Sequence, residues 1–242
     1  MHLGILKVDS VRDEFIANHG DYPDMFEHLL LRADPSLRIS IFDIQGGDIP
    51  EPSQCDGYLI TGSRDSVYDD LPWIPPLVEF VGKLRAQEIK LAGICFGHQL
   101  IAHFFGGRVG AAEEGWAVGV HSCEIIEHDQ WMTPVSEQLS LLSSHKDQVL
   151  ELPHDAILYA TNNFCPNAGF TIGNHTITIQ GHPEFQKDYA RDLMTFRKDL
   201  LGETVFESGI DSLSIPVDQS LMGRWLVNFF AGRSQTETSD SK

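Results

Sequence analysis

A cysteine framed by two glycines carries the strongest chemical signal in the sequence. Cys95 stands between Gly93 and Gly97, after the apolar run 89–94 and at the start of a helical pattern. Such a strand–turn–helix junction is typical of a nucleophile elbow, which exposes one side chain at the end of a parallel strand and directs helix amides at it. Those amides also favour the thiolate, the reactive form of the side chain. Cys95 is therefore the candidate nucleophile.

A candidate base and its orienting acid lie in the segment 180–185, far from Cys95 along the chain. His182 and Glu184 are separated by Pro183 alone. In extended backbone, residues two apart point to the same side, so the carboxylate can reach one imidazole nitrogen while the other faces the thiol. The three residue types then form a nucleophile, a base and an orienting group. On its own, the His-Pro-Glu stretch would more simply be an exposed turn.

Together with a third segment, these motifs resemble a known family. The third segment is the strand-like run 58–61 followed by the small-residue turn Gly62-Ser63. In this order, the motifs resemble those of class I (triad) glutamine amidotransferases, whose glutaminase domains cleave a γ-glutamyl amide through a cysteine thioester. The resemblance spans residues 40–200. It is specific for the catalytic chemistry and much less so for the physiological substrate.

The resemblance also implies which residues surround the reacting carbonyl. Backbone N–H groups of Gly62 and Phe96 are expected to stabilise the oxyanion, which needs two preorganised donors. Gln99, on the first turn after the elbow, is expected to help hold the glutamyl group. The segment containing Ser144 and His145 is similar to the Ser-His-x-Asp segment of amidotransferases close to GMP synthase and of related γ-glutamyl peptidases. There it helps to hold the amino-acid end of the substrate.

The order of the elements predicts a flavodoxin-like, three-layer α/β fold, with a mostly parallel sheet, helices on both faces and appended antiparallel strands. The expected parallel strands are 3–8, 37–44, 57–61 and 89–94, and the helices between them are 22–33, 73–87 and 97–105. The expected antiparallel strands are 118–126, 139–142, 149–152, 157–160, 170–172 and 176–179. Two amphipathic helices, 187–201 and 220–230, follow. Packing on the domain is the favoured reading of both, over binding a partner.

Length and composition indicate one ordinary globular domain. With 242 residues, of which 42% are hydrophobic, the chain can bury one large α/β core. We expect a single class I glutamine amidotransferase domain over residues 1–232, including the last helix. Residues 233–242 contain no apolar side chain, and we expect a disordered tail there.

Charge and hydropathy exclude several classes of partner. The net charge is −18, from 17 basic and 35 acidic residues, which argues against nucleic acids and anionic membranes. No apolar run approaches the roughly 18 residues of a membrane-spanning helix. The N-terminus lacks the basic region and cleavage site of a signal peptide, so we expect a cytoplasmic protein.

The remaining cysteines and histidines give no indication of a metal or cofactor. Cys55, Cys123 and Cys165 form no C-x-x-C pair and are best explained as small buried residues. His98 and His103 are five apart, a spacing that does not place both on one helix face. We therefore expect catalysis without a cofactor.

Three functions remain compatible with the sequence. The chain shows neither a Gly-x-x-x-x-Gly-Lys phosphate loop nor a pyrophosphatase loop, so we expect a free-standing domain. The favoured hypothesis is hydrolysis of glutamine, with the ammonia passed to a separate synthase subunit. The alternatives are a γ-glutamyl peptidase and a non-catalytic interaction module on the same fold. The loop 64–72 and the segment 111–119, which includes Trp116, are the expected walls on the leaving-group side.

Overall fold

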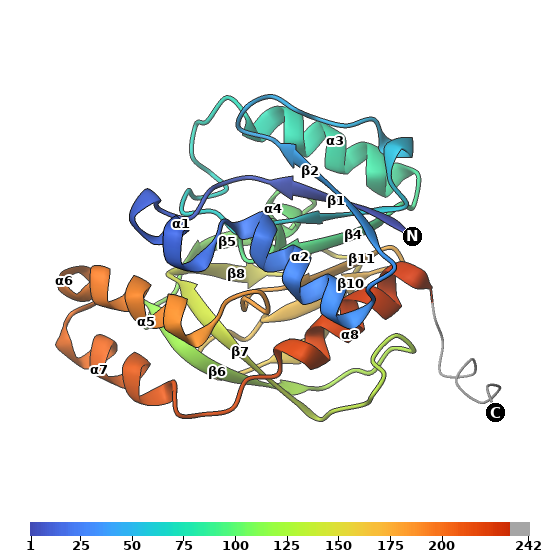
Figure 1. Cartoon of the computed structure of the whole chain (residues 1–242). Coiled ribbons are helices and arrows are strands. Elements are labelled where there is room, and N and C mark those ends of the chain that lie inside the picture. The colour runs from blue at the N-terminus through green and yellow to red at the C-terminus, as the bar shows by residue number, and fades with distance from the viewer. Residues whose placement is uncertain (233–242) are drawn as a thin grey trace.

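The computed structural model describes residues 1–232 (Figure 1), and the predicted disordered tail, 233–242, lies outside them. The strands are β1 (His2–Lys7), β2 (Arg38–Asp43), β3 (Gly57–Ile60), β4 (Lys90–Ile94), β5 (Arg108–Ala111), β6 (Ala117–Ile125), β7 (Gln138–His145), β8 (Asp147–Glu151), β9 (Ala156–Thr161), β10 (Gly169–Ile172) and β11 (Thr176–Ile179). The helices are α1 (Asp13–His19), α2 (Tyr22–Ala33), α3 (Ile74–Ala86), α4 (Phe96–Phe104), α5 (Lys187–Phe196), α6 (Lys198–Leu201), α7 (Glu203–Ser212) and α8 (Gln219–Ala231), with a 3-10 turn at Pro52–Gln54.

One large sheet organises the described part of the chain. Its strand order is β2-β1-β3-β4-β11-β10-β9-β6-β7, and β5 and β8 form a small separate sheet. The strands from β2 to β11 pair in parallel, and those from β11 to β7 pair antiparallel. The predicted α/β fold with appended antiparallel strands is therefore confirmed. Two details differ: strand 176–179 pairs in parallel with β4, and strand 149–152 belongs to the small sheet.

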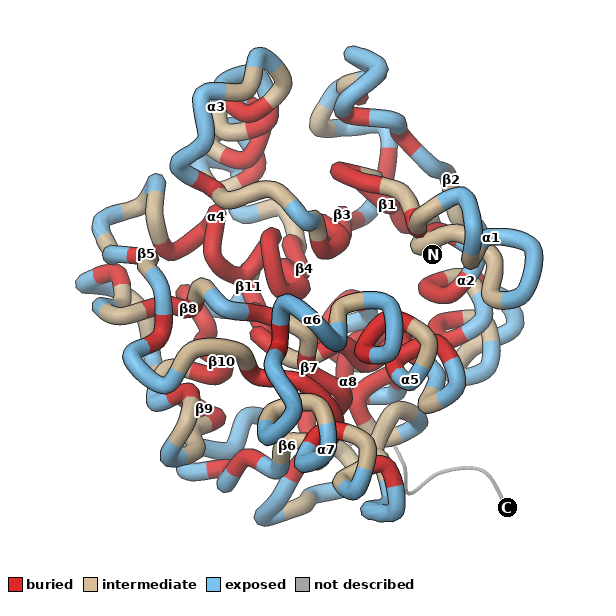
Figure 2. Tube along the Cα trace, turned by 90° about the vertical axis from the view of Figure 1, so that its left-hand side faces the viewer, coloured by how far each residue is buried: buried red, intermediate tan, exposed pale blue. Residues whose placement is uncertain are grey.

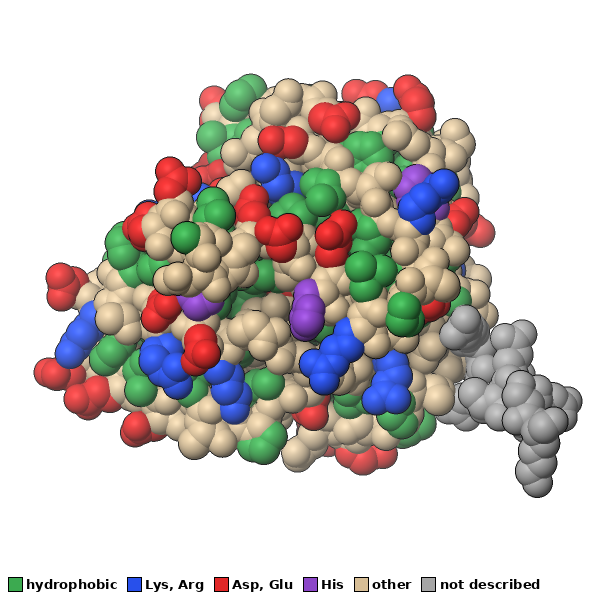
Figure 3. Space-filling view, viewed as in Figure 1, with side chains coloured by type: hydrophobic (Ala, Val, Ile, Leu, Met, Phe, Trp, Pro, Cys, Tyr) green, Lys and Arg blue, Asp and Glu red, His purple; other side chains and the backbone are tan. Residues whose placement is uncertain are grey.

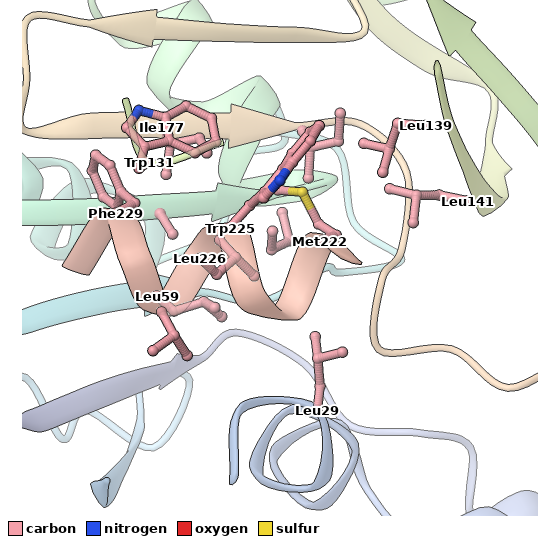
Figure 4. Close-up of a cluster of buried hydrophobic side chains, with 14 of the residues drawn as sticks. Leu29, Leu59, Trp131, Leu139, Leu141, Ile177, Met222, Trp225, Leu226 and Phe229 are labelled. Carbon is pink, nitrogen blue, oxygen red and sulfur yellow. The ribbon is translucent and has the colours of Figure 1, made fainter. Parts of the chain in front are cut away.

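Helices cover both faces of the inner parallel strands, so β3, β4 and β11 are buried on both sides, whereas the edge strand β2 is largely exposed (Figure 2). Alternate residues of β3 point to opposite faces. Leu59 packs in the cluster under α2 and α8, which also contains Leu29 and Trp225 (Figure 4). Tyr58 and Ile60 pack in the cluster under α3 and α4. The order of layers is thus helix, sheet, helix.

The C-terminal half contains more helix than the sequence pattern predicts. The expected helix 187–201 is interrupted at Arg197, whose φ and ψ of −95° and 11° end α5. Gly202, at φ 75°, then separates α6 from α7. The sequence analysis missed α7 and α1, because α7 is flanked by glycine and a turn and α1 buries no residue completely. Helices α5 and α7 lie beside β6 at one end of the molecule, and α1 packs against α5 (Figure 1).

The sheet topology brings distant segments to one edge. β3, β4 and β11 are neighbours and run in parallel, so their carboxyl ends meet. Gly62 follows β3, Cys95 follows β4, and His182 follows β11. In open α/β sheets, ligands bind beyond the carboxyl ends of the strands. This edge is therefore where the fold can build a site.

Candidate active site

Cys95 occupies a strained turn between β4 and α4. Its φ of 50° and ψ of −96° form a backbone conformation that residues with a Cβ rarely adopt. A Cβ placed on Gly93 would lie 2.7 Å from the backbone of Gly97, and one on Gly97 would lie 2.8 Å from the Cβ of Ile60. The two glycines thus let α4 begin directly against the sheet. This backbone geometry matches that expected of the predicted elbow.

The structure brings His182 and Glu184 to Cys95. The imidazole Nδ1–H donates to Oε1 of Glu184 at 2.7 Å, and both side chains are buried. His182 is itself fixed by its backbone N–H, which donates to the carbonyl oxygen of Leu142 at 2.7 Å. Cys95 and His182 line the same cavity. The juxtaposition predicted from the two motifs is present.

The electrostatics of this trio favour a charged imidazole. Burial disfavours protonation of His182, but the negative charges of Glu184 and of the Cys95 thiolate outweigh it and raise the pKa of His182 above its ordinary value. The nearby His145 behaves in the opposite way, because burial and the positive charges of other histidines lower its pKa to about 3. The pKa values of these two neighbouring histidines are thus shifted in opposite directions.

Phe185 fixes the plane of the His182 imidazole and was missed in the sequence analysis. Its ring stacks on that of His182, with centroids 3.9 Å apart and planes 9° from parallel. Tyr22 stacks on the other side of Phe185. Phe185 is 2% exposed, so this stack is fixed within the core. An aromatic residue directly after the His-Pro-Glu segment was the available signal.

Gln180 is a second residue that the sequence analysis left without a role. Its side-chain Nε2 donates to Sγ of Cys95 at 3.4 Å. Its Oε1 accepts from Nε2 of Gln99 at 3.1 Å, and the same nitrogen donates to the carbonyl oxygen of Asp147 at 2.7 Å. Gln99 therefore fixes which end of Gln180 faces the sulfur. The period-two spacing of Gln180, His182 and Glu184 would have indicated that their side chains share one side.

Gly62 lies against Cys95 and His182, and Phe96 is the first residue of α4. A Cβ on Gly62 would lie 2.9 Å from Cε1 of His182 and 3.6 Å from the Cβ of Cys95. The N–H of Phe96 belongs to the first turn of α4, where amides lack an intrahelical acceptor. The predicted oxyanion pair thus flanks Cys95.

We expect the Gly62→Ala substitution to lower kcat by at least about 10²-fold, because a displacement of roughly 1 Å at a catalytic group costs that much. The new methyl would collide with the His182 ring. The matched control is Gly82→Ala on α3, where an added Cβ meets no atom within 4 Å. Steady-state kinetics with a γ-glutamyl substrate measures both. Near wild-type kcat for Gly62→Ala would show that the site tolerates a shift of the base.

Ser144 and His145 also border the cavity, at the end of β7. His145 Nδ1–H donates to the carbonyl oxygen of Asp147 at 3.1 Å, which shapes the turn into β8. The hydroxyl of Ser144 accepts from Nη1 of Arg197 at 2.9 Å. Both residues thus line the same cavity as Cys95.

The cavity has a volume of about 240 Å³ and opens beside Cys95. Its lining residues are Tyr22, Ser63, Arg64, Asp65, Ser66, Cys95, Gln99, Trp116, Ser144, His145, Lys146, Asp147, His182, Phe185, Leu193 and Arg197. Residues 64–66 and Trp116 line the cavity, so both segments expected to form its walls contribute to it. Arg64 is fixed by a bidentate pair with Asp9, at 2.9 Å for each contact.

Arg197 is an arginine without a carboxylate partner within the described part of the chain. Its guanidinium lies over the ring of Trp116, 5.5 Å from the centroid, and donates only to Ser144. Burial lowers the pKa of Arg197, yet an arginine stays charged. The structure thus places a cation in the wall of the cavity, next to Ser144 and Trp116. The sequence pattern of the predicted helix 187–201 does not identify Arg197 as a residue of the cavity wall.

Residues 1–232 contain no group of three or more His, Cys, Asp or Glu side chains placed to hold a metal ion. No helix among them has the length and apolar character needed to cross a membrane.

Comparison with known proteins identifies the family. A model described as glutamine amidotransferase class-I matches residues 20–199. A solved glutamine amidotransferase from Thermotoga maritima has a TM-score of 0.73 at 19% identity, over 96% of this chain and 97% of that one. This structural likeness supports the fold. The chain belongs to the class-I glutamine amidotransferase family.

Two relatives are plant peptidases. Gamma-glutamyl peptidase 3 of Arabidopsis thaliana is 36% identical over 157 residues, which cover 61% of this chain and 63% of the peptidase. The match thus spans less than two thirds of that relative. Gamma-glutamyl peptidase 4 of the same plant is 32% identical over 184 residues, which cover 73% of this chain and 72% of the peptidase.

Proposed function

We propose that the protein hydrolyses the amide bond of a γ-glutamyl compound through a thioester on Cys95. The observation that carries this proposal is the buried trio in which His182 is held by Glu184 at 2.7 Å beside the strained Cys95. A thiolate paired with an imidazolium is the activated form of a cysteine nucleophile. The family and the peptidase relatives support the same class of reaction.

The first half-reaction follows from the positions of these groups. The thiolate of Cys95 attacks the γ-carbonyl carbon, and the N–H groups of Gly62 and Phe96 stabilise the resulting oxyanion. The C–N bond breaks as His182 gives its proton to the leaving nitrogen. In the second half-reaction, His182 takes a proton from water, which attacks the thioester. Glutamate and the free thiolate are released.

A γ-glutamyl peptide is the substrate that the cavity supports best. Glutamine releases ammonia, so the only carboxylate it offers to a cation in the wall is its own α-carboxylate. Arg197 and Trp116 instead suit a larger leaving group that ends in a carboxylate. The relatives named γ-glutamyl peptidases point the same way. Glutamine hydrolysis that feeds a separate synthase subunit is the second candidate, favoured by the family itself.

Arg197→Ala tests the choice between these substrates. We expect KM for a γ-glutamyl dipeptide with a free terminal carboxylate to rise about 10-fold or more, since a hydrogen bond to a charged group contributes about 1.5–3 kcal/mol. KM for the same dipeptide with an amidated terminus should stay within about twofold, as should that for glutamine. Steady-state kinetics with the three substrates measures this. An equal rise in KM for all three would assign Arg197 to the glutamyl group that they share, or to the packing of the wall, and would remove the argument for a peptide substrate.

A further inference from the structure

A second cavity lies on the helical face behind the catalytic carboxylate. It has a volume of about 360 Å³ and is bounded by α2, by α8 and by the segment between β11 and α5. Its lining residues are Met25, His28, Leu29, Arg32, Ala33, Pro183, Glu184, Gln186, Gln219, Ser220 and Arg224. The two helices approach closely, since a Cβ on Gly223 would lie 3.0 Å from Cδ1 of Leu29. Only Glu184 is shared with the catalytic trio.

Two arginines line this cavity, and the one carboxylate in its described lining, Glu184, pairs with His182 instead of with either of them. Arg32 comes from α2 and Arg224 from α8, and neither forms an ion pair or a side-chain hydrogen bond with residues 1–232. His28 stands one turn before Arg32, so both lie on the same helix face. Figure 3 shows a histidine and basic side chains close together where α2 and α8 meet. Both arginines are exposed, in a chain whose net charge is −18.

The segment that lines this cavity also positions the carboxylate of Glu184. Nε2 of Gln219 on α8 donates to the carbonyl oxygens of Pro183 and Phe185, on either side of Glu184. Oε2 of Glu184 is buried and has no hydrogen-bond partner within the described chain. His182 therefore fixes one oxygen of the carboxylate. The position of the other oxygen depends on the backbone segment that Gln219 holds. A ligand between α2 and α8 would press on that segment.

We propose that this cavity binds a small organic or inorganic oxyanion, a carboxylate or a phosphate, between Arg32 and Arg224. Guanidinium groups bind such oxyanions in bidentate fashion, and His28 and Ser220 add further donors. The cavity volume fits a ligand of metabolite size. Bound there, the anion joins α2 to α8 and restrains the segment around Glu184. The binding step is independent of the proposed hydrolysis, whereas its effect on turnover rests on it.

The first test measures binding on the full chain, with inorganic phosphate and citrate as separate probes. Isothermal titration should give one saturable site for at least one probe. Arg32→Gln and Arg224→Gln should each weaken it about 10-fold or more. Lys83→Gln on α3 removes the same charge from the opposite face and should leave the affinity unchanged. The two probes distinguish a phosphate site from a carboxylate site.

Two results would overturn the proposal: no saturable binding of either probe, or equal binding by wild type and both arginine variants. A thermal melting curve shows whether a glutamine variant folds. If one does not fold, Arg32→Lys or Arg224→Lys replaces it. Weakened binding is still expected, because lysine cannot make the bidentate contact.

The second test asks whether the anion acts on the reaction. Saturating probe should raise kcat for a γ-glutamyl substrate in wild type and leave KM unchanged, and Arg32→Gln should abolish this response. Cys95→Ala should bind the probe normally although it cannot turn over. If wild type binds the probe as expected but cleaves no γ-glutamyl bond, the proposed function is refuted and the anion site is not. An unchanged kcat at saturation would refute the coupling to Glu184.

Discussion

We expect Cys95→Ala to lower kcat for γ-glutamyl hydrolysis on the order of 10⁵-fold while the protein still folds. Removal of a catalytic nucleophile has effects of this size in other triad hydrolases, because the residual rate comes from binding and the oxyanion donors alone. The substitution removes one small atom group from a buried turn. Rates measured at high enzyme concentration, together with the melting temperature, separate chemistry from folding.

A companion variant tests the strain at the elbow. Cys95 has a φ of 50°, which glycine adopts without the cost of a Cβ. Cys95→Gly should therefore be at least as stable as Cys95→Ala, and equally inactive. If Cys95→Ala retained substantial activity, another cysteine would have to be the nucleophile, and the assignment of the site would be wrong.

The second large effect is expected at the base and its partner. His182→Ala should lower kcat on the order of 10⁵-fold, and Glu184→Gln about 10³- to 10⁴-fold, since an amide still holds the ring in part. Glu184→Gln should also lower the pKa of His182, because the Glu184 carboxylate helps to raise it. Histidine ring resonances followed through a pH titration measure that shift. A pKa of His182 unchanged by Glu184→Gln would show that another group sets its charge.

The same pKa has a consequence for stability. A pKa raised in the folded state means that protonation of His182 stabilises the fold. This contribution is complete below the pKa of an unfolded histidine, about 6.5, and is lost as the pH rises through the folded-state value. The stability advantage of wild type over Glu184→Gln should therefore shrink as the pH is raised above about 6.5. Urea unfolding at a series of pH values measures it.

The motifs around Cys95 and His182 could be read from the sequence because each is local. A glycine-framed cysteine between a strand and a helix, and a histidine two residues from a carboxylate, carry their geometry in their spacing. The structure places both at adjacent parallel strands. The family inferred from these motifs is confirmed by the match over residues 20–199. The catalytic roles of the individual residues stay predictions.

The contacts that were missed depend on tertiary structure. Gln180 donates to Cys95 across 85 residues of sequence, and Arg197 reaches Ser144 across 53. No local spacing encodes such pairs. Strand 176–179 was assigned to the antiparallel set, because its pairing with β4 depends on a crossover of the whole second half of the chain. The break in helix 187–201 at Arg197 could not be predicted either, because the helical pattern of the sequence continues through that residue.

The central claim is that a γ-glutamyl group becomes attached to Cys95 during turnover. Acid quenching within the first turnovers, followed by mass spectrometry of the digested protein, tests this directly. The account predicts that one glutamyl group is found as a thioester on the peptide containing Cys95, and that it is absent from Cys55, Cys123 and Cys165. A glutamyl group on any of those three cysteines would contradict the account. So would turnover by wild type, or by the slower Glu184→Gln, with no modified Cys95 peptide.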